Sequence, residues 1–306
     1  MEASTTATYS KGLVRNKKYY RKRLLPWLLL SPALLLLLLV VGGPIVGTLW
    51  LSFTNWDGIG SAEFIGLKNF TSLINDKVFY AALLNNVKWM AFFLTIPVIA
   101  ALSIALLVSK VNYGQKFYRV MVFLPYIVAT VVTAKIWLWL YNPYVGINVI
   151  LKNWGLENIA LSWLGDSKIV LYAVALADGW HFWGFLVVLF LIALQQLDSS
   201  LEEAAIVEGA NKVQVFWSVI LPQLRPTFVL IYMLLIIWSF AAFDYVFVMT
   251  QGGPGSASEL LATYMYKLAI YNQQPGYASA VAMTMGIFSI IVILGFGYLK
   301  KKGWDV

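Results

Sequence analysis

Four charged or titratable side chains interrupt long apolar runs of this sequence. Asp178 and His181 are three residues apart, a spacing that places both on one face of a helix. Asp244 and Lys135 stand in two other apolar runs. Burying such groups costs free energy unless they are paired or face a polar space, so the pattern predicts a functional site inside an apolar protein. Lys135 has a second interpretation, in which its ammonium reaches the surface or pairs with an acid.

Aromatic side chains are dense around these polar groups, namely Trp137, Trp139, Trp180, Trp183, Trp238 and Tyr245. A sugar ring has apolar faces edged by hydroxyl groups, so aromatic rings beside hydrogen-bonding groups suit a sugar. A cavity at the centre of a helical bundle would supply both kinds of group. The alternative is that many of these tryptophans only pack, or form a belt at the membrane interface.

Several catalytic and cofactor-binding patterns are missing. The sequence has no cysteine, and its single histidine, His181, cannot form a histidine-rich metal site or a Ser-His-Asp relay. No G-x-x-x-x-G-K-S/T stretch occurs, because the run Gly252-Gly253-Pro254-Gly255 lacks the lysine and hydroxyl that hold phosphate and Mg²⁺. We therefore expect no catalytic residue, no metal and no cofactor in this chain, and do not interpret it as an enzyme on its own.

The elements that must position these residues are membrane spans. Hydrophobic residues make up 60% of the 306 residues and charged residues only 12%, against roughly 45–50% and 25% in soluble domains. Since a spanning helix needs about 20 apolar residues, six runs qualify: 26–50, 81–109, 120–140, 169–194, 228–249 and 277–299. The first run is too long for the core of a secretory signal and is interpreted as an uncleaved anchor. The predicted fold class is an all-α membrane protein with six transmembrane helices.

The distribution of lysine and arginine predicts the orientation. With both termini in the cytoplasm, the inner tails and loops would hold 15 of the 22 basic residues, seven of them in the N-terminal tail. The net charge of +8 is thus a topology signal, with contact to anionic lipid as a further use, and does not indicate nucleic acid binding. We divide the chain into a basic cytoplasmic tail (1–25), a six-span domain (26–299) and a cytoplasmic tail (300–306).

One long interruption, here called the charged segment (residues 198–226), is neither membrane-like nor loop-like. Ser200 and Glu203 have the spacing of a capping box at a helix start. Gly209 is expected to end this helix, and a second helix is expected over residues 212–219. Pro222 and Pro226 then set the angle at which the chain leaves. The segment is predicted to form a compact pair of short helices on the cytoplasmic side.

The charged segment also carries a resemblance to a known family. Glu203-Ala204-Ala205, then Gly209, then Leu221-Pro222 resembles the EAA motif of the integral membrane subunits of ABC importers, with Val219 where that family usually has isoleucine. Gln195-Gln196-Leu197-Asp198, Phe243-Asp244 and the run from Thr250 to Gly255 are similar to the sugar-importing branch, as in the maltose permease subunits. The resemblance covers roughly the last two thirds of the chain.

The resemblance implies a type I ABC importer permease fold in a bacterial or archaeal inner membrane. In that family the charged segment is a coupling helix that docks in a cleft of a cytoplasmic ATPase. The implied partners are a second permease, two ATPase subunits that bind ATP and Mg²⁺, an extracytoplasmic binding protein and a sugar. The residues expected to couple to the ATPase are Glu203, Ala204, Ala205, Gly209, Val213, Phe216, Trp217, Leu221 and Pro222.

Substrate contacts in the family come from positions near the middle of the spans. The positions that match here are Tyr126, Thr130, Asp178, His181, Ser239 and Asp244, with Ala242 as a departure because it cannot form side-chain hydrogen bonds. Two other functions stay open on the sequence alone. One is a proton-coupled secondary transporter that uses Asp178, His181 or Asp244 as its relay, and the other is a membrane sensor or scaffold that transports nothing.

Overall fold

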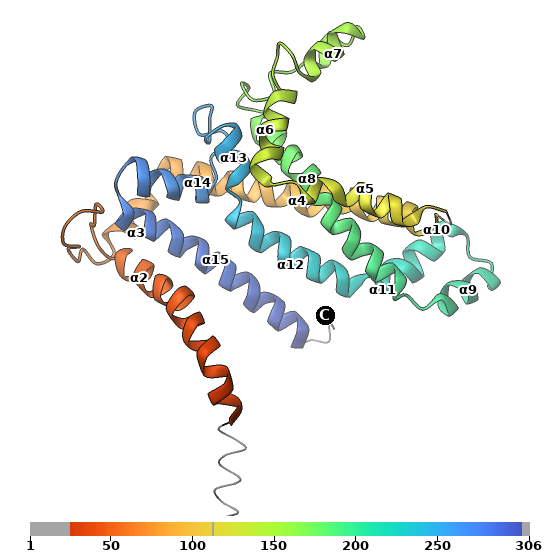
Figure 1. Ribbon diagram of the computed structural model, residues 1–306, viewed down its shortest axis with the longest axis horizontal. Helices are drawn as coiled ribbons and strands as arrows, with labels where there is room; N and C mark the ends of the chain where they lie inside the picture. The colour runs from red at the N-terminus through yellow and green to blue at the C-terminus, as the bar shows by residue number, and fades with distance from the viewer. Residues whose placement is uncertain (1–24, 112, 302–306) are drawn as a thin grey trace, which may run out of the picture.

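The computed structural model describes residues 25–111 and 113–301, and it consists of helices and connecting loops (Figure 1). Within that part of the chain the only β-type pairing is one antiparallel bridge between Thr54 and Phe64. Five helices are long and apolar enough to cross a membrane, and a bent pair of shorter helices supplies a sixth span. The predicted all-α class with six spans is confirmed. The tails at 1–24 and 302–306 lie outside the described residues.

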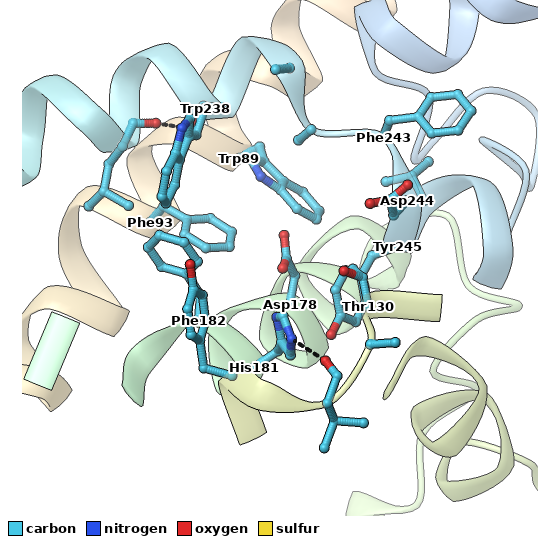
Figure 2. Close-up of a pocket in the computed structure, with 18 of the residues that line it drawn as sticks. Trp89, Phe93, Thr130, Asp178, His181, Phe182, Trp238, Phe243, Asp244 and Tyr245 are labelled. Carbon is cyan, nitrogen blue, oxygen red and sulfur yellow. Dashed lines mark hydrogen bonds between the residues drawn. The ribbon is translucent and has the colours of Figure 1, made fainter. Parts of the chain in front are cut away.

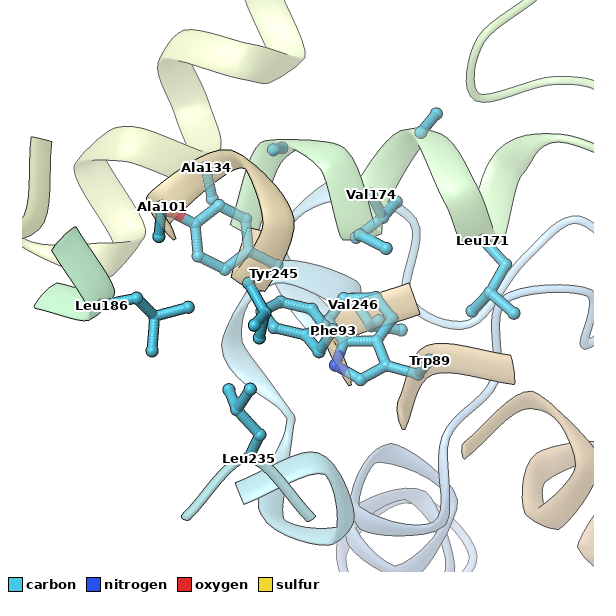
Figure 3. Close-up of a cluster of buried hydrophobic side chains, with 14 of the residues drawn as sticks. Trp89, Phe93, Ala101, Ala134, Leu171, Val174, Leu186, Leu235, Tyr245 and Val246 are labelled. Atoms are coloured by element: carbon cyan, nitrogen blue, oxygen red, sulfur yellow. The ribbon is translucent and has the colours of Figure 1, made fainter. Parts of the chain in front are cut away.

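Two long helices form the centre of the bundle. α4 (Lys77–Ser109) packs along α8 (Val170–Gln195), and their buried side chains meet those of later helices in one core (Figure 3). Trp89 and Phe93 from α4 lie there against Leu235 and Val246. α4 starts earlier than the predicted position 81 because the Asp76 carboxylate caps it, accepting hydrogen bonds from the amides of residues 78 and 79 at 2.9 and 3.0 Å.

The third span is broken, whereas the sequence predicted one continuous helix over 120–140. α5 (Gln115–Ile127) and α6 (Thr130–Leu140) meet at 91°. Pro125 lies in the last turn of α5 and has no amide hydrogen to donate, and the backbone is extended at Val128 and non-helical at Ala129. The break leaves backbone groups of both residues without helical partners.

The fifth span is also interrupted. α12 (Arg225–Ala241) ends where Ala242 turns extended, and α13 (Asp244–Met249) continues in a new direction after Phe243. α13 packs against α6 and α8, so the interruptions of the third and fifth spans come together near the middle of the molecule.

The chain then folds back to one end of the bundle. α14 (Leu261–Tyr266) and the π-helical turn η4 (Lys267–Tyr271) precede the last span, α15 (Pro275–Lys301). α3 (Lys68–Ile74) lies at the same end, at the left of Figure 1. The buried Asn69 of α3 donates hydrogen bonds from its side-chain amide to the carbonyls of Ser52 and Thr54, at 2.9 and 2.8 Å. α7 (Ile147–Asn153) and the 3₁₀ turn η2 (Glu157–Ile159) project separately between the third and fourth spans.

The first span, Leu25–Leu51, stands apart from this bundle. It includes the π-helical turn η1 (Leu38–Gly42) and α2 (Gly43–Leu51), and among the described helices it packs mainly against α15. Its side chains are almost all exposed, with Leu29 70% and Leu36 61% accessible. An apolar helix with so little protein contact is suited to lipid or to another membrane subunit.

Candidate functional site

A cavity of about 600 Å³ lies where the two broken spans meet. Its wall is formed by α4, the junction between α5 and α6, the middle of α8, the end of α12 and the start of α13 (Figure 2). Breaks in two spans bring backbone as well as side chains to the wall. Irregular backbone inside a membrane protein is tolerated where it is buried in protein or lines a cavity, so the position of the breaks explains the position of the cavity.

His181 holds one of these breaks in place. Its ring Nε2 donates a hydrogen bond to the Val128 carbonyl oxygen at 3.0 Å, which satisfies a group that the interrupted helix leaves free (Figure 2). The imidazole also lies between the rings of Tyr126 and Tyr245, with centroid distances of 5.6 and 5.9 Å. The single histidine of the chain is therefore a link between α8 and the bend in the third span.

The polar groups of the cavity are mostly oxygen atoms. The carboxylates of Asp178 and Asp244 point toward the same space from α8 and α13, and Thr130 lies at the start of α6 (Figure 2). The Ser239 hydroxyl lines the cavity but donates its hydrogen to the Leu235 carbonyl at 2.7 Å, so it faces the cavity as an acceptor.

Aromatic rings form the remaining wall. Trp238 lies edge-on to Phe182 with a centroid distance of 4.8 Å, and Trp89 stacks on Phe93 at 5.4 Å. These four rings and Tyr126 border the cavity beside the carboxylates. The arrangement places apolar faces and hydrogen-bond acceptors around the same space.

All six residues predicted to contact substrate line this one cavity: Tyr126, Thr130, Asp178, His181, Ser239 and Asp244. Ala242, noted as a departure from the family pattern, lines it as well. The structure thus brings the six together, and their role in binding stays a prediction. Lys135 is an exposed residue of α6 and is not among the lining residues.

The aromatic part of the prediction was only partly right. Trp238 and Tyr245 line the cavity, whereas the other four predicted aromatic residues do not. Trp137 packs on Tyr141 and Trp180, at 5.2 and 5.8 Å between centroids, and Trp139 is 59% exposed. These side chains leave α6 and α8 on faces turned away from the cavity.

Sequence reasoning missed Trp89 and Phe93. They are four residues apart on α4, so they share one helix face. The adjacent turn of that face carries Asn85 and Asn86, which are buried and hydrogen-bonded to the loop before α14 and to the end of α12. Two amides and two aromatic residues at helical spacing were the signal available in the sequence.

The charged segment forms a second distinctive region, at the end of the bundle opposite α3 and α14 (Figure 1). It contains α9 (Ser199–Val207), α10 (Lys212–Val215), the π-helical turn η3 (Phe216–Ile220) and α11 (Leu221–Gln223). The prediction of two short helices separated at Gly209 is confirmed. The second helical stretch runs past the predicted end at 219, because it widens into a π turn before Pro222, which has no amide hydrogen to donate.

The predicted capping box at Ser200 and Glu203 was wrong. Asp198 is the N-cap of α9, and its carboxylate accepts hydrogen bonds from the Ser200 hydroxyl at 2.6 Å and the Ser200 amide at 2.9 Å. These two bonds lower the pKa of Asp198. A capping box does occur at the start of α10, where Asn211 and Gln214 satisfy each other's backbone amides.

Gly209 makes the turn between the two helices at φ +92°, a region that favours glycine, and no other group lies within 4 Å of the point where a Cβ atom would stand. The surface around the turn is apolar as well as charged. Val207, Val213 and Trp217 are 87%, 66% and 63% exposed, and Glu203 is exposed beside them. The other predicted coupling residues are exposed or half-buried, namely Ala204, Ala205, Phe216, Leu221 and Pro222.

Comparison with known proteins decides the family. Residues 94–302 match the model of a family described as the binding-protein-dependent transport system inner membrane component. The chain belongs to this family. It is a membrane-embedded permease subunit of an ABC importer, and the matched range contains the charged segment and every part of the cavity wall except Trp89 and Phe93.

The permease has relatives along nearly its whole length. It is 33% identical over 286 residues to a probable ABC transporter permease of Bacillus subtilis, covering 92% of this chain and 96% of that protein. It is 31% identical over 294 residues to the trehalose/maltose transport system permease protein MalF of Thermococcus litoralis, covering 94% of this chain and 96% of that protein.

Solved structures support the fold of the permease. A chain of a bacterial ABC transporter involved in import of the acidic polysaccharide alginate superposes with a TM-score of 0.82 at 20% identity, covering 94% of this chain and 99% of that one. A bacterial alginate ABC transporter has also been solved in complex with an alginate pentasaccharide-bound periplasmic protein, and its matching chain gives the same TM-score. The expected type I importer fold is confirmed.

Proposed function

We propose that this permease provides the translocation path of an ATP-driven sugar importer. The observation that carries the proposal is the cavity at the two helix breaks, where aromatic faces and oxygen acceptors border the same space of about 600 Å³. That volume lies within the range of small-molecule sites, roughly 300–1,000 Å³. The trehalose/maltose permease among the relatives supports a sugar as the cargo.

Each part of the wall has a role in this proposal. Trp238, Trp89 and Tyr126 pack against the apolar faces of the sugar ring, and Asp178 and Asp244 accept hydrogen bonds from its hydroxyl groups. Acceptors that point into a cavity are best satisfied by a ligand rich in donors, since unpaired buried polar groups are costly. Thr130 supplies a hydroxyl that both donates and accepts.

The charged segment is the proposed site of coupling to an ATPase. Its helices project beyond the spans and present Val213 and Trp217 with Glu203, a mixture of apolar and charged surface that suits docking into a cleft of another protein. ATP and Mg²⁺ would be bound by two ATPase subunits, and this chain would have no catalytic activity of its own. A second permease and an extracytoplasmic binding protein complete the proposed importer.

Transport would proceed by alternating access. Nucleotide-driven movement of the ATPase pair would shift the charged segment, and the bundle would open the cavity to one side and then to the other. Both termini and the charged segment would lie in the cytoplasm of a bacterial or archaeal cell, as the distribution of basic residues predicts.

ATP-driven uptake of a labelled disaccharide into vesicles that contain the assembled importer tests this function. Trp238→Ala should weaken uptake about tenfold, since it removes one aromatic face of the cavity. Trp139→Ala is the matched control and should leave uptake unchanged, because Trp139 faces away from the cavity.

Two results would contradict the proposal. Uptake that a protonophore abolishes and that needs no ATP would indicate a proton-coupled transporter, in which Asp178, His181 or Asp244 serves as the relay. Absence of any uptake, together with no ATPase in the purified complex, would indicate a sensor or scaffold.

A further inference from the structure

The cavity has a marked asymmetry in the charge of its wall. Two carboxylates, Asp178 and Asp244, point into it, and no lysine or arginine is among its lining residues in the part of the chain that the structure describes. The nearest candidate along the third span, Lys135, is exposed on α6 and does not line the cavity. The described wall therefore holds two carboxyl groups and no lysine or arginine to balance them.

The other polar groups do not change this balance. His181 directs Nε2 at the Val128 carbonyl, so that nitrogen is used within the protein. Ser239 donates its hydroxyl hydrogen to Leu235. The Tyr245 hydroxyl is buried at the wall with no hydrogen-bond partner in normal geometry. The remaining donors at the wall, such as the Thr130 and Tyr245 hydroxyls, are neutral, so none of them balances the two acidic groups.

We propose that Asp178 and Asp244 select the cargo by charge, admitting neutral sugars and sugars that carry an amino group and rejecting sugars that carry carboxylate or phosphate. The proposal rests on the proposed function, since it specifies the class of sugar that the same cavity takes. Hydroxyl and ammonium groups donate to carboxylates, and an ammonium adds a charge-assisted hydrogen bond. An anionic group would meet like charge in a space that water screens weakly.

The fold itself does not fix this preference. The solved importer that shares the fold is involved in import of an acidic polysaccharide, whereas a relative of this chain belongs to a transport system for trehalose and maltose, which are neutral sugars. Similar permeases thus serve cargo of different charge. Which charge is accepted then depends on side chains at the wall, and in this chain the two carboxylates are the only charged groups there among the described residues.

The test is direct binding of three matched disaccharides to the purified assembled importer without its binding protein, which removes selection by that partner. The probes are a neutral glucose disaccharide, the same disaccharide with a 2-amino group, and the same disaccharide with a 6-carboxylate. The wild type should bind the amino form most tightly and the carboxylate form at least about tenfold more weakly than the neutral form.

Asp178→Asn and Asp244→Asn keep the side-chain shape and remove the charge. Each should reduce the ratio of amino-form to carboxylate-form affinity by about tenfold, and together they should bring the two forms close to equality. Glu157→Gln removes an exposed acid far from the cavity, on η2, and should leave the ratio unchanged. Recovery of the complete complex with its ATPase activity shows that each variant is folded.

Equal binding of the carboxylate and neutral forms by the wild type would overturn the charge preference while leaving the sugar function intact. An unchanged ratio in the double variant would overturn the assignment to these two residues. Absence of binding by all three sugars would instead contradict the proposed function, together with the inference that depends on it.

Discussion

Asp76 combines two structural roles at the start of α4. Its carboxylate caps the helix by accepting from the amides of Val78 and Phe79, and it also accepts hydrogen bonds from the Tyr264 and Tyr277 hydroxyls, the latter at 2.7 Å. Burial raises the pKa of Asp76, but the bonds from Tyr264, the two amides and Tyr277 outweigh it, so the pKa lies below its usual value. One carboxylate thus joins α4, α14 and α15.

Asp76→Asn should destabilise the permease by about 1 kcal/mol at neutral pH, because an amide still caps the helix but accepts weaker hydrogen bonds from the tyrosines. A lowered pKa in the folded state contributes stability above the unfolded value of about 3.9, and that contribution is lost as the pH falls through the folded value. The difference in the free energy of unfolding between Asp76→Asn and the wild type should therefore become smaller below about pH 4. Thermal unfolding of the purified protein measures it.

Asp57→Asn is the control for this prediction. Asp57 is exposed and accepts only from the Ile59 amide in a turn, so its replacement should change stability by no more than about 0.5 kcal/mol at any pH. A pH-independent loss in Asp76→Asn would show that the tyrosine bonds do not depend on the charge of the carboxylate.

Individual residues of the site were predictable to different degrees. Asp178, His181 and Asp244 stand out in the sequence, because an ionisable side chain in an apolar run is costly to bury and is usually functional. Trp89 and Phe93 stand out less, because aromatic residues in α4 look the same whether they face a core or a cavity, and only the neighbouring Asn85 and Asn86 mark their helix face. Ser239 was found by resemblance, yet its hydroxyl hydrogen turns back to its own helix, a detail that only the structure contains.

At the scale of elements, the turn at Gly209 is the most sharply testable feature. Gly209→Ala forces a side chain into a backbone conformation with φ +92°, at a cost of about 1 kcal/mol, while nothing nearby would clash with it. The strain should distort the junction of α9 and α10 and lower the sugar transported per ATP hydrolysed, with sugar binding in the distant cavity unchanged. Transport and hydrolysis measured on the same vesicles give this ratio.

Gly209→Asn is the matched variant, since asparagine tolerates positive φ better than alanine does. Gly209→Asn should therefore transport more sugar per ATP hydrolysed than Gly209→Ala does. Equal ratios in both variants and the wild type would show that the geometry of this turn does not transmit force.

The breaks in the third and fifth spans were beyond the sequence prediction, and the reason is tertiary. Pro125 marks a weak point in the third span, but proline alone usually kinks a membrane helix without ending it, as Pro97 in α4 illustrates. The 91° bend depends also on His181, which binds the Val128 carbonyl from another helix. Periodicity within one run of sequence contains no information on such a partner.

At the scale of the whole molecule, two regions outside the spans lie at opposite ends of the helical bundle. α3, α14 and the loops around them lie at one end of the bundle, and the charged segment lies at the other (Figure 1). The number of spans and the position of the charged segment along the chain followed from the sequence, because both depend on apolar run lengths and composition. The sequence did not predict how far the first span stands from the bundle.

The chain has no cysteine, so single cysteines can report which end faces which side of the membrane. Ile59→Cys and Val207→Cys introduce thiols at exposed positions of opposite ends, 76% and 87% accessible in the parent residues. A maleimide that does not cross membranes should label Ile59→Cys in intact cells and Val207→Cys only after permeabilisation. Labelling of Val207→Cys in intact cells would reverse the proposed orientation.

The bond from the single histidine to the bend has a practical consequence for spectroscopy. If this subunit alone is grown with ¹⁵N-labelled histidine, the assembled importer contains one labelled imidazole for each copy of the chain, because His181 is unique in the sequence. Its two nitrogen signals differ when one of them donates to the Val128 carbonyl. Their change through the transport cycle would follow the bend in the third span directly, without an attached probe.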